Sequence, residues 1–470
     1  MRKTILLSLL ALASIGAWAD KVKTYPAPEK APLNNDFAIS VRTAGGEWQK
    51  VDAYAWKVDQ VVDARHKTEI SSVAYFDFEG KVEVKVESLR QPDVKSCKVR
   101  PTSYGIPFKV DGNTITFSLD RPRDLSIEVN GDIFHNLQLF ANGMEQKVKK
   151  GKDVIYFSPG YYDLGNDSIA VGSGKTLYVA GGAYIKGRAS VWKAKGAKVI
   201  GHGIINPERA QAGLMVRYSS NVTVDGVITT QLPVGGSDSV SVSNAKCISW
   251  YGWGDGMNVF ASNNVSYSHV FCRTSDDCST IYCTRLGYHG GCRNISVTDA
   301  VYWADVAHPI MIGLHGDIAK NEIIENVVYD GVDILDQAEK QIDYQGCIGI
   351  NNGDNITVRN VTFRNFHIEN IRQGMLFNFR VCYNKKYCTA PGRGIENILL
   401  ENIDYKGENA EHSIMTGYSH DRMIRNITFK NLTINGKQIS DDMPGKPKWY
   451  KTSDMARMFV GEHVENVKFE

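Results

Sequence analysis

The chain has 470 residues, with 54 basic and 52 acidic side chains and a formal net charge of +2. Proteins that bind nucleic acids or membrane surfaces usually carry a basic excess, so this balance argues against both classes. The length suffices for two or three average domains, or for one large solenoid with a smaller domain.

The first nineteen residues have the pattern of a signal peptide. Arg2 and Lys3 precede an apolar run over 5–15, and an Ala-Trp-Ala sequence at 17–19 provides a small-x-small cleavage site. The apolar run is too short to span a bilayer. No cysteine lies near the cleavage site to carry a lipid anchor. We therefore expect an exported protein without a membrane span, either secreted or periplasmic.

The segment 20–148 is predicted to form an antiparallel β-sandwich domain. Alternating apolar and polar residues occur over 37–43, 72–88, 113–120 and 124–131, with turn-forming residues between them. Several short alternating runs separated by turns are typical of such sandwiches.

A repeat dominates the rest of the chain. An asparagine followed by Ile, Val or Leu, any residue, and an apolar or aromatic residue recurs along this region; eight copies define the repeat, and a weaker copy occurs at Asn244. The eight are Asn221, Asn264, Asn294, Asn326, Asn355, Asn397, Asn426 and Asn466. Each copy is a short β-branched run that indicates a strand, and helix signals are nearly absent between copies.

A strand-and-turn repeat of this length predicts a β-solenoid, whose coils bury their apolar rows against one another. We expect an all-β protein with a right-handed parallel β-helix over 149–435, preceded by the sandwich, and a capping segment at 436–470. The repeated asparagines should stack in one column. Nine cysteines in an exported chain permit disulfides, and Cys382 and Cys388 could bridge a loop. Small buried hydrophobes are the alternative interpretation for the other cysteines.

Three aspartates form the most concentrated acidic group of the solenoid region. Asp255 precedes Asp276 by 21 residues and Asp277 by 22. This spacing corresponds to one coil, which places the carboxylates ~4.8 Å apart along the axis. Crowded carboxylates repel one another, so the cluster disfavours stability and indicates function. Catalysis is the main interpretation, and metal binding is an alternative.

Hydrolysis of a glycosidic bond needs such a group. One carboxyl must be protonated to donate to the leaving oxygen, and a neighbouring negative charge raises its pKa. Another must stay ionised to activate water. Adjacent residues of a regular strand point to opposite faces, so Asp276 and Asp277 can share a cleft only at a strand end or a corner.

The sequence resembles the polygalacturonase family, glycoside hydrolase family 28, whose motifs are Asn-Thr-Asp, Asp-Asp-Cys and Gly-x-His-Gly. This chain has Trp-Gly-Asp-Gly at 253–256, Asp-Asp-Cys at 276–278 and Gly-Leu-His-Gly at 313–316. The resemblance covers about 150–435. It implies an inverting β-helix hydrolase of a polysaccharide or oligosaccharide.

By this resemblance, Asp276 would be the general acid, and Asp255 and Asp277 would hold the nucleophilic water. His315 would tune the acid or position the sugar. The family's Arg-Ile-Lys motif, which contacts galacturonate carboxylates, has only a partial counterpart around Arg380. The sandwich and the segment 301–316 are more similar to the dextranase and isopullulanase family, glycoside hydrolase family 49.

Five further residues are candidates for substrate binding. Trp253 and Tyr282 could stack on sugar faces, and Arg273 and Arg380 could bind an acidic sugar. Each of these also has an ordinary interpretation, as a core aromatic or as a surface ion-pair partner. His308, next to a proline, is the fifth candidate, and a structural role explains it as well.

Two other functions remain open from the sequence. A polysaccharide lyase of the pectate-lyase type shares the solenoid but needs a calcium-binding acidic cluster and a basic catalytic residue. A non-catalytic carbohydrate-binding solenoid would not need paired acids at one-coil spacing. We expect no cofactor and no metal, a carbohydrate substrate as the partner, no nucleic acid, and a monomer.

Overall fold

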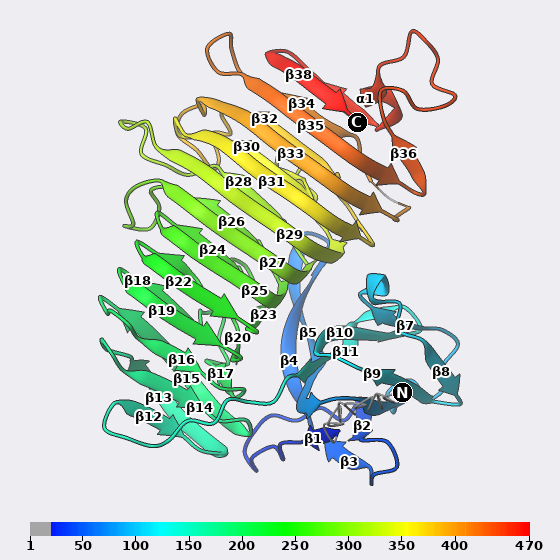
Figure 1. Ribbon diagram of the computed structural model, residues 1–470, viewed down its shortest axis with the longest axis vertical. Helices are drawn as coiled ribbons and strands as arrows, with labels where there is room; N and C mark the ends of the chain where they lie inside the picture. The colour runs from blue at the N-terminus through cyan, green and yellow to red at the C-terminus, as the bar shows by residue number, and fades with distance from the viewer. Residues whose placement is uncertain (1–19, 409) are drawn as a thin grey trace, which may run out of the picture.

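The computed structural model describes residues 20–408 and 410–470, so the predicted signal peptide at 1–19 lies outside the described residues. An all-β architecture is confirmed: a two-sheet sandwich lies beside a long right-handed parallel β-helix (Figure 1). Within the described part, no helix is long and apolar enough to cross a bilayer.

The sandwich consists of a six-stranded and a five-stranded sheet. The first sheet contains β1 (Lys21–Lys23), β4 (Ala53–Val62), β5 (Arg65–Glu79), β7 (Cys97–Arg100), β10 (Arg123–Val129) and β11 (Asp132–Asn142). The second contains β2 (Phe37–Arg42), β3 (Gln49–Val51), β6 (Val82–Ser88), β8 (Phe108–Asp111) and β9 (Thr114–Leu119); the 3-10 turn η1 (Thr102–Tyr104) follows β7.

Alternating residues of the two sheets meet in one buried core, including Ile39, Val84, Ile115 and Leu139. One prediction about this sandwich is wrong in detail, because the sheets are not wholly antiparallel. The strand β11 pairs with β5 in parallel over Leu137–Asn142. The hairpins β4–β5 and β10–β11 lie side by side, and the strands that meet run in the same direction.

The solenoid is one continuous sheet of 27 strands wound into three faces. Face one contains β12 (Val154–Phe157), β14 (Thr176–Val179), β16 (Lys198–Ile200), β19 (Ser220–Asp225), β22 (Asp238–Ser243), β25 (Asn263–Thr274), β27 (Cys292–Ala304), β29 (Ile323–Gln337), β31 (Thr357–Ile368), β33 (Gly394–Tyr405), β35 (Ile424–Ile434) and β38 (Val464–Phe469). Face two begins with β13 (Gly160–Ala170), β15 (Ala183–Trp192), β17 (Ile204–Asn206), β20 (Ile228–Thr229) and β23 (Lys246–Ile248) and continues in the second halves of the long strands from β25 onward.

Face three contains β18 (Leu214–Arg217), β21 (Val234–Gly235), β24 (Met257–Phe260), β26 (Ser279–Tyr282), β28 (Ile310–Gly313), β30 (Ile348–Asn352), β32 (Phe377–Val381), β34 (Ser413–Thr416) and β37 (Met458–Val460). A short turn, η2 (Ile342–Tyr344), lies in the connection before β30. The strands of successive coils pair in parallel, and several strands of face three, such as β26 and β30, are buried at every residue.

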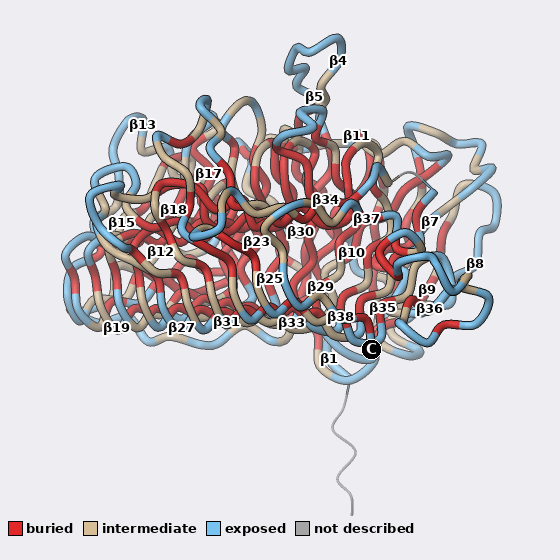
Figure 2. Tube along the Cα trace, turned by 90° about the horizontal axis from the view of Figure 1, so that it is seen from above, coloured by how far each residue is buried: buried red, intermediate tan, exposed pale blue. Residues whose placement is uncertain are grey.

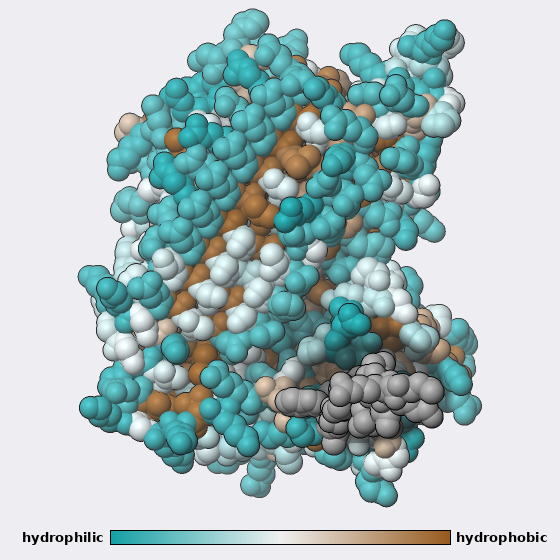
Figure 3. Space-filling model, in the orientation of Figure 1, coloured by the Kyte–Doolittle hydropathy of each residue, from teal (hydrophilic) through white to brown (hydrophobic). Residues whose placement is uncertain are grey.

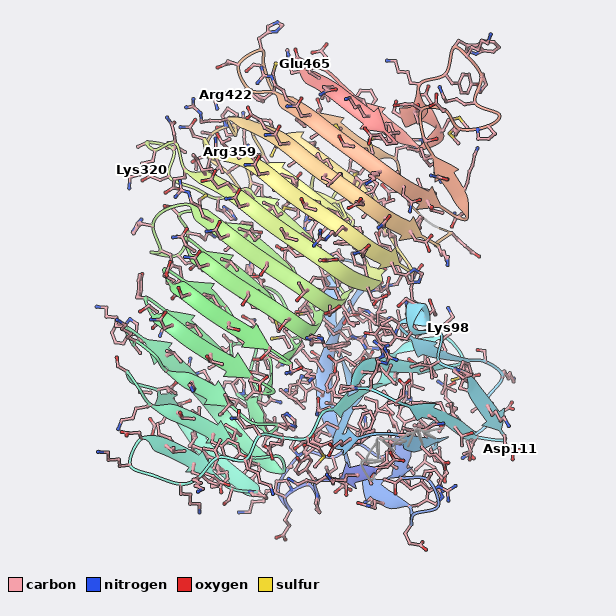
Figure 4. All side chains as sticks on the ribbon, in the orientation of Figure 1. Lys98, Asp111, Lys320, Arg359, Arg422 and Glu465 are labelled. Carbon is pink, nitrogen blue, oxygen red and sulfur yellow. The ribbon has the colours of Figure 1, made fainter. Side chains whose placement is uncertain are left out.

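Equivalent residues of successive coils stack inside the solenoid and form its core. One such row is buried throughout and consists of Val224, Val242, Tyr267, Val297, Tyr329, Phe363, Leu400, Phe429 and Phe469. The buried interior extends along the whole solenoid (Figure 2). On the surface, residues of similar hydropathy form rows along the axis (Figure 3). Charged residues such as Arg359 and Glu465 project at the rim (Figure 4).

The predicted asparagine column exists at a corner of the coils. Amide-to-amide hydrogen bonds of 2.8–3.5 Å join Asn264, Asn294, Asn326, Asn360, Asn397, Asn426 and Asn466. Every one of these residues has a positive φ of 54–59°. Asparagine tolerates this left-handed backbone because its short polar side chain bonds locally.

Two asparagines were assigned to this column wrongly. Asn355 lies at another corner, where its amide donates to the carbonyl oxygens of Ile318 and Lys320, and Asn360 takes its place. Asn244 lies at a second corner, where its amide donates to Asp225 at 2.8 Å. In later coils this corner has its own short ladder, in which Asn431 donates to Asn402 and Asn402 to Asn365, each at 2.9 Å. A long strand such as β31 or β33 bends at two positions, and an asparagine with a positive φ lies at each bend, so these coils have two asparagine corners.

The last segment does more than cap the solenoid. The strand β36 (Lys437–Ile439) folds back on β35 as an antiparallel hairpin, and the one-turn helix α1 (Thr452–Met455) follows. The strands β37 and β38 then resume parallel pairing with β34 and β35. Cys382 and Cys388, which the sequence left as a possible bridge, are not bonded to each other in this structure, where all nine cysteines are free thiols.

The sandwich is attached to the solenoid by a buried interface. Tyr54 and Trp56 of β4 pack against Ile228, Ile248 and other residues of face two. The Trp56 indole nitrogen donates to the Ile248 carbonyl oxygen at 2.9 Å. This contact fixes the β4–β5 hairpin against the coils that carry the acidic group.

Candidate active site

The three predicted catalytic aspartates lie at the corner of the solenoid between face two and face three. Asp255 belongs to the connection between β23 and β24, and Asp276 and Asp277 belong to the connection between β25 and β26. The backbone of Met257 pairs with that of Ser279. Asp255 and Asp277 therefore occupy equivalent positions in neighbouring coils, ~4.8 Å apart along the axis.

Asp276 and Asp277 are outside the regular strands, as a shared cleft requires. The Thr274 hydroxyl donates to the Asp276 carbonyl oxygen at 2.6 Å, and the Asp277 amide donates to the Asp276 carboxylate at 3.0 Å. These bonds hold a turn in which both aspartates line one cavity. The alternation of a strand would have separated them.

A cavity of about 770 Å³ opens over this corner. It brings together six of the predicted site residues, namely Asp255, Asp276, Asp277, His315, Trp253 and Tyr282. Its volume is that of a small-molecule site with a few convergent polar groups. Trp253 is 85% exposed at the cavity mouth, whereas Tyr282 is buried.

Asp277 is held by donors on both carboxylate oxygens. The Tyr282 hydroxyl donates to Oδ2 at 3.0 Å, and Nδ1 of His308 lies 2.6 Å from Oδ1. Burial alone would lower the pKa of His308, but the negative charge of Asp277 and the hydrogen bond to it raise that pKa. Nε2 of His308 contacts the Tyr344 carbonyl oxygen, which can only accept a hydrogen bond, so both ring nitrogens face acceptors and His308 holds Asp277 in place.

The other two aspartates are partly exposed to the cavity and have raised pKa values. Burial, followed by the charges of Asp255 and Asp277, raises the pKa of Asp276 well above its usual range. Burial, followed by the charge of Asp277, raises the pKa of Asp255 to about 7. The corner thus holds one carboxyl group with hydrogen-bond donors on both oxygens and two carboxyls that retain a proton more readily, an unequal arrangement of the kind that acid–base chemistry needs.

His315 is neutral in this environment. Burial and the neighbouring Arg285 lower its pKa to about 3. Its ring stands edge-on to Tyr282 with centroids 4.9 Å apart, and its Nδ1 lies 3.3 Å from an Arg285 nitrogen. His315 can exchange hydrogen bonds with a ligand in the cavity, but it is not an acid at neutral pH.

Arg273 cannot contact a ligand, contrary to its assignment as a substrate-binding residue. It is fully buried and points from β25 toward the sandwich. Its guanidinium pairs with Asp305 at 2.8 Å and donates to Asn136 of β11 at 2.7 Å. Arg273 therefore connects the solenoid to the sandwich.

Arg380 and His308 also lie apart from the cavity lining. Arg380 lies on β32 and pairs with Asp343 at 3.2 Å. His308 is buried behind Asp277, where it contacts the aspartate and the Tyr344 carbonyl oxygen. It can position Asp277 but cannot touch a sugar.

The cavity includes residues that the sequence did not single out. Arg285, Glu339 and Tyr387 line it from the connections that follow β26, β29 and β32, Tyr344 lines it from η2, and His66 enters from the sandwich. The Tyr344 and Tyr387 rings stack at 4.5 Å. Connections between solenoid strands often carry binding residues, but no sequence motif marks Arg285, Glu339, Tyr344 or Tyr387. Among the described residues, no group of three or more His, Cys, Asp or Glu side chains is arranged to hold a metal ion.

Residues 161–447, which include every solenoid residue of the site, match the model of glycosyl hydrolases family 28. The chain belongs to this family. Family 28 membership makes it a glycoside hydrolase. No curated protein matches the sequence.

The solved structures similar to this family 28 chain include Dex49A from Penicillium minioluteum. The two are 14% identical over 95% of this chain and 96% of that one, with a TM-score of 0.58. A family 28 exopolygalacturonase of Yersinia enterocolitica is 12% identical over 83% of this chain and 96% of its own, with a TM-score of 0.47. At such identity the Dex49A likeness shows the fold alone, including the sandwich before the β-helix.

Proposed function

We propose that this protein is an exported, monomeric glycoside hydrolase that cleaves a polysaccharide or oligosaccharide with inversion at the anomeric carbon. The observation that carries the proposal is the division of roles within one cavity. Asp277 is stabilised as a carboxylate by His308 and Tyr282, while Asp255 and Asp276 have raised pKa values. The pattern of a signal peptide at 1–19 supports export.

In the proposed reaction, Asp276 donates its proton to the glycosidic oxygen as the bond to the anomeric carbon breaks. A water held by Asp255 and Asp277 attacks the same carbon from the opposite face, and its proton passes to Asp277. Exchange with solvent returns both groups to their starting states. An inverting enzyme needs ~6.5–9.5 Å between acid and base to admit the water. In the proposal Asp255, which lies one coil away from Asp276 and Asp277, holds the water on the side away from the acid.

The substrate is proposed to differ from unmodified polygalacturonate. The cavity is lined by four acidic residues and by a single arginine, Arg285, which contacts His315. Arg380, the partial counterpart of the family motif, is paired with Asp343. A chain with a carboxylate on every unit would meet more repulsion than attraction here.

Activity is expected to follow a bell-shaped pH profile. Asp255 must be ionised, so activity should fall as the pH drops through about 7, and not near the 3.8 of an ordinary aspartate. Asp276 must be protonated, so its raised pKa should keep the enzyme active to a higher pH before activity falls on the alkaline side. Because the three carboxyl groups interact, the apparent pKa values of the two sides of the profile belong to the three aspartates together. Measuring kcat/KM from about pH 4 to 10 tests this, and an acid limb near 4 would contradict it.

The proposal is tested on a panel of pectic, dextran-like and other plant and algal glycans. Reducing-end release without unsaturated uronate absorbance establishes hydrolysis, whereas such absorbance would indicate a lyase. Proton NMR of the first-formed product should show the inverted anomer. A retained anomer, or polygalacturonate as the best substrate, would overturn the corresponding part of the proposal.

A further inference from the structure

The β4–β5 hairpin of the sandwich reaches the cavity of the solenoid. Its tip stands clear of the body of the molecule (Figure 2). Below the tip, Trp56 bonds to Ile248, and the Lys57 ammonium lies 4.2 Å from the centroid of the Trp250 ring. The hairpin is thereby fixed beside the connection that carries Asp255.

His66 extends from this hairpin into the cavity lining. Its ring centroid is 5.7 Å from that of Tyr251. A Cβ built on Gly252 would lie 3.7 Å from Nε2 of His66, so this nitrogen lies over the backbone just before Asp255. Among the residues that the structure describes, His66 is the one cavity-lining residue that comes from the sandwich.

A buried carboxylate fixes the orientation of His66. Asp59 is fully buried, and its Oδ2 lies 2.5 Å from Nδ1 of His66. Its other oxygen has no hydrogen-bond partner within the described residues. Burying a carboxylate with one partner is unfavourable for folding. In this arrangement Nδ1–H of His66 donates to the Asp59 carboxylate, which leaves Nε2 available toward the cavity, as in carboxylate–histidine pairs of binding sites.

We propose that His66 is a substrate-contacting residue whose Nε2 binds a hydroxyl of the sugar on the Asp255 side of the cavity, with Asp59 as its positioning residue. This inference rests on the proposed function, because it takes the cavity to hold a glycan. The sandwich then forms one wall of the substrate site, and the enzyme needs both domains for full affinity.

Replacing His66 with alanine should raise KM by about 3–30-fold and change kcat little, because the lost hydrogen bond acts on the bound chain and not on the breaking bond. H66Q, which keeps a side-chain donor and acceptor, should recover part of the affinity. Asp59→Asn should raise KM less than H66A. The double variant should match H66A alone, since Asp59 acts through His66.

K67A is the matched control, because Lys67 is exposed on the same strand and does not line the cavity. Its kinetics should equal those of the wild type, and thermal melting should confirm that every variant is folded. Equal KM values for H66A and K67A would overturn the proposal, as would a KM for the folded D59N/H66A variant clearly higher than that of H66A, because Asp59 would then act independently of His66. The comparison uses whichever glycan the wild type cleaves, so an active D276N variant would overturn the aspartate assignment and leave the His66 result standing.

Discussion

Replacing Asp276 with asparagine is expected to lower kcat by about 10²–10⁴-fold, which is the usual contribution of general acid catalysis. Asparagine has the same shape as aspartic acid but cannot donate a proton to the leaving oxygen. KM should change little, because the cavity keeps its lining and Asp277 keeps its partners His308 and Tyr282. Initial rates on the best glycan of the panel measure the effect.

The same variant should be at least as stable as the wild type at neutral pH. The folded-state pKa of Asp276 is raised, so ionising this group opposes folding as the pH rises above the unfolded value of about 3.9. An amide removes that penalty, and thermal melting at neutral and acidic pH should show it. Asp299→Asn is the matched control, since Asp299 is an exposed corner aspartate outside the catalytic cavity. A folded D276N enzyme with D299N-like rates would refute the acid assignment.

The sequence predicted the fold because each coil repeats the same local chemistry. The ambiguity lay in register. Asn355 and Asn360 both begin matches to the repeat pattern, five residues apart, and only pairing of Val361 with Val327 and Ile398 places Asn360 in the column. A period of two along a strand cannot resolve which of two overlapping copies occupies the corner.

The aspartates were predictable because their separation equals one coil, which fixes their relative positions whatever the register elsewhere. The outlying residues were not. Arg273 lies on β25, just before the turn that carries Asp276 and Asp277, but its side chain points to the sandwich. The alternation of side chains along a strand does not show which face of the strand another domain covers. His66 reaches the cavity through a contact between domains, for which the sequence has no local signal.

The final expectation concerns the pair that holds the water. Asp255→Asn and Asp277→Asn should each lower kcat by an amount similar to that of Asp276→Asn, on the order of 10²–10⁴-fold. The double variant should be little worse than either single one, because losing one ligand of the water already removes the attacking geometry. Multiplied losses would show that the two carboxylates act independently.

Stability should separate the two single variants even where their rates agree. Asp277→Asn leaves the buried, positively charged His308 without its carboxylate, which should destabilise the protein by about 3–5 kcal/mol. Asp255 is bonded to Asn258 and has no cationic ion-pair partner among the described residues, so Asp255→Asn should melt near or above the wild type at neutral pH. Rates must therefore be measured well below the melting temperature of D277N. Equal melting temperatures for the two variants would contradict the charged pair between Asp277 and His308, and with it the assignment of Asp277 as the stabilised carboxylate.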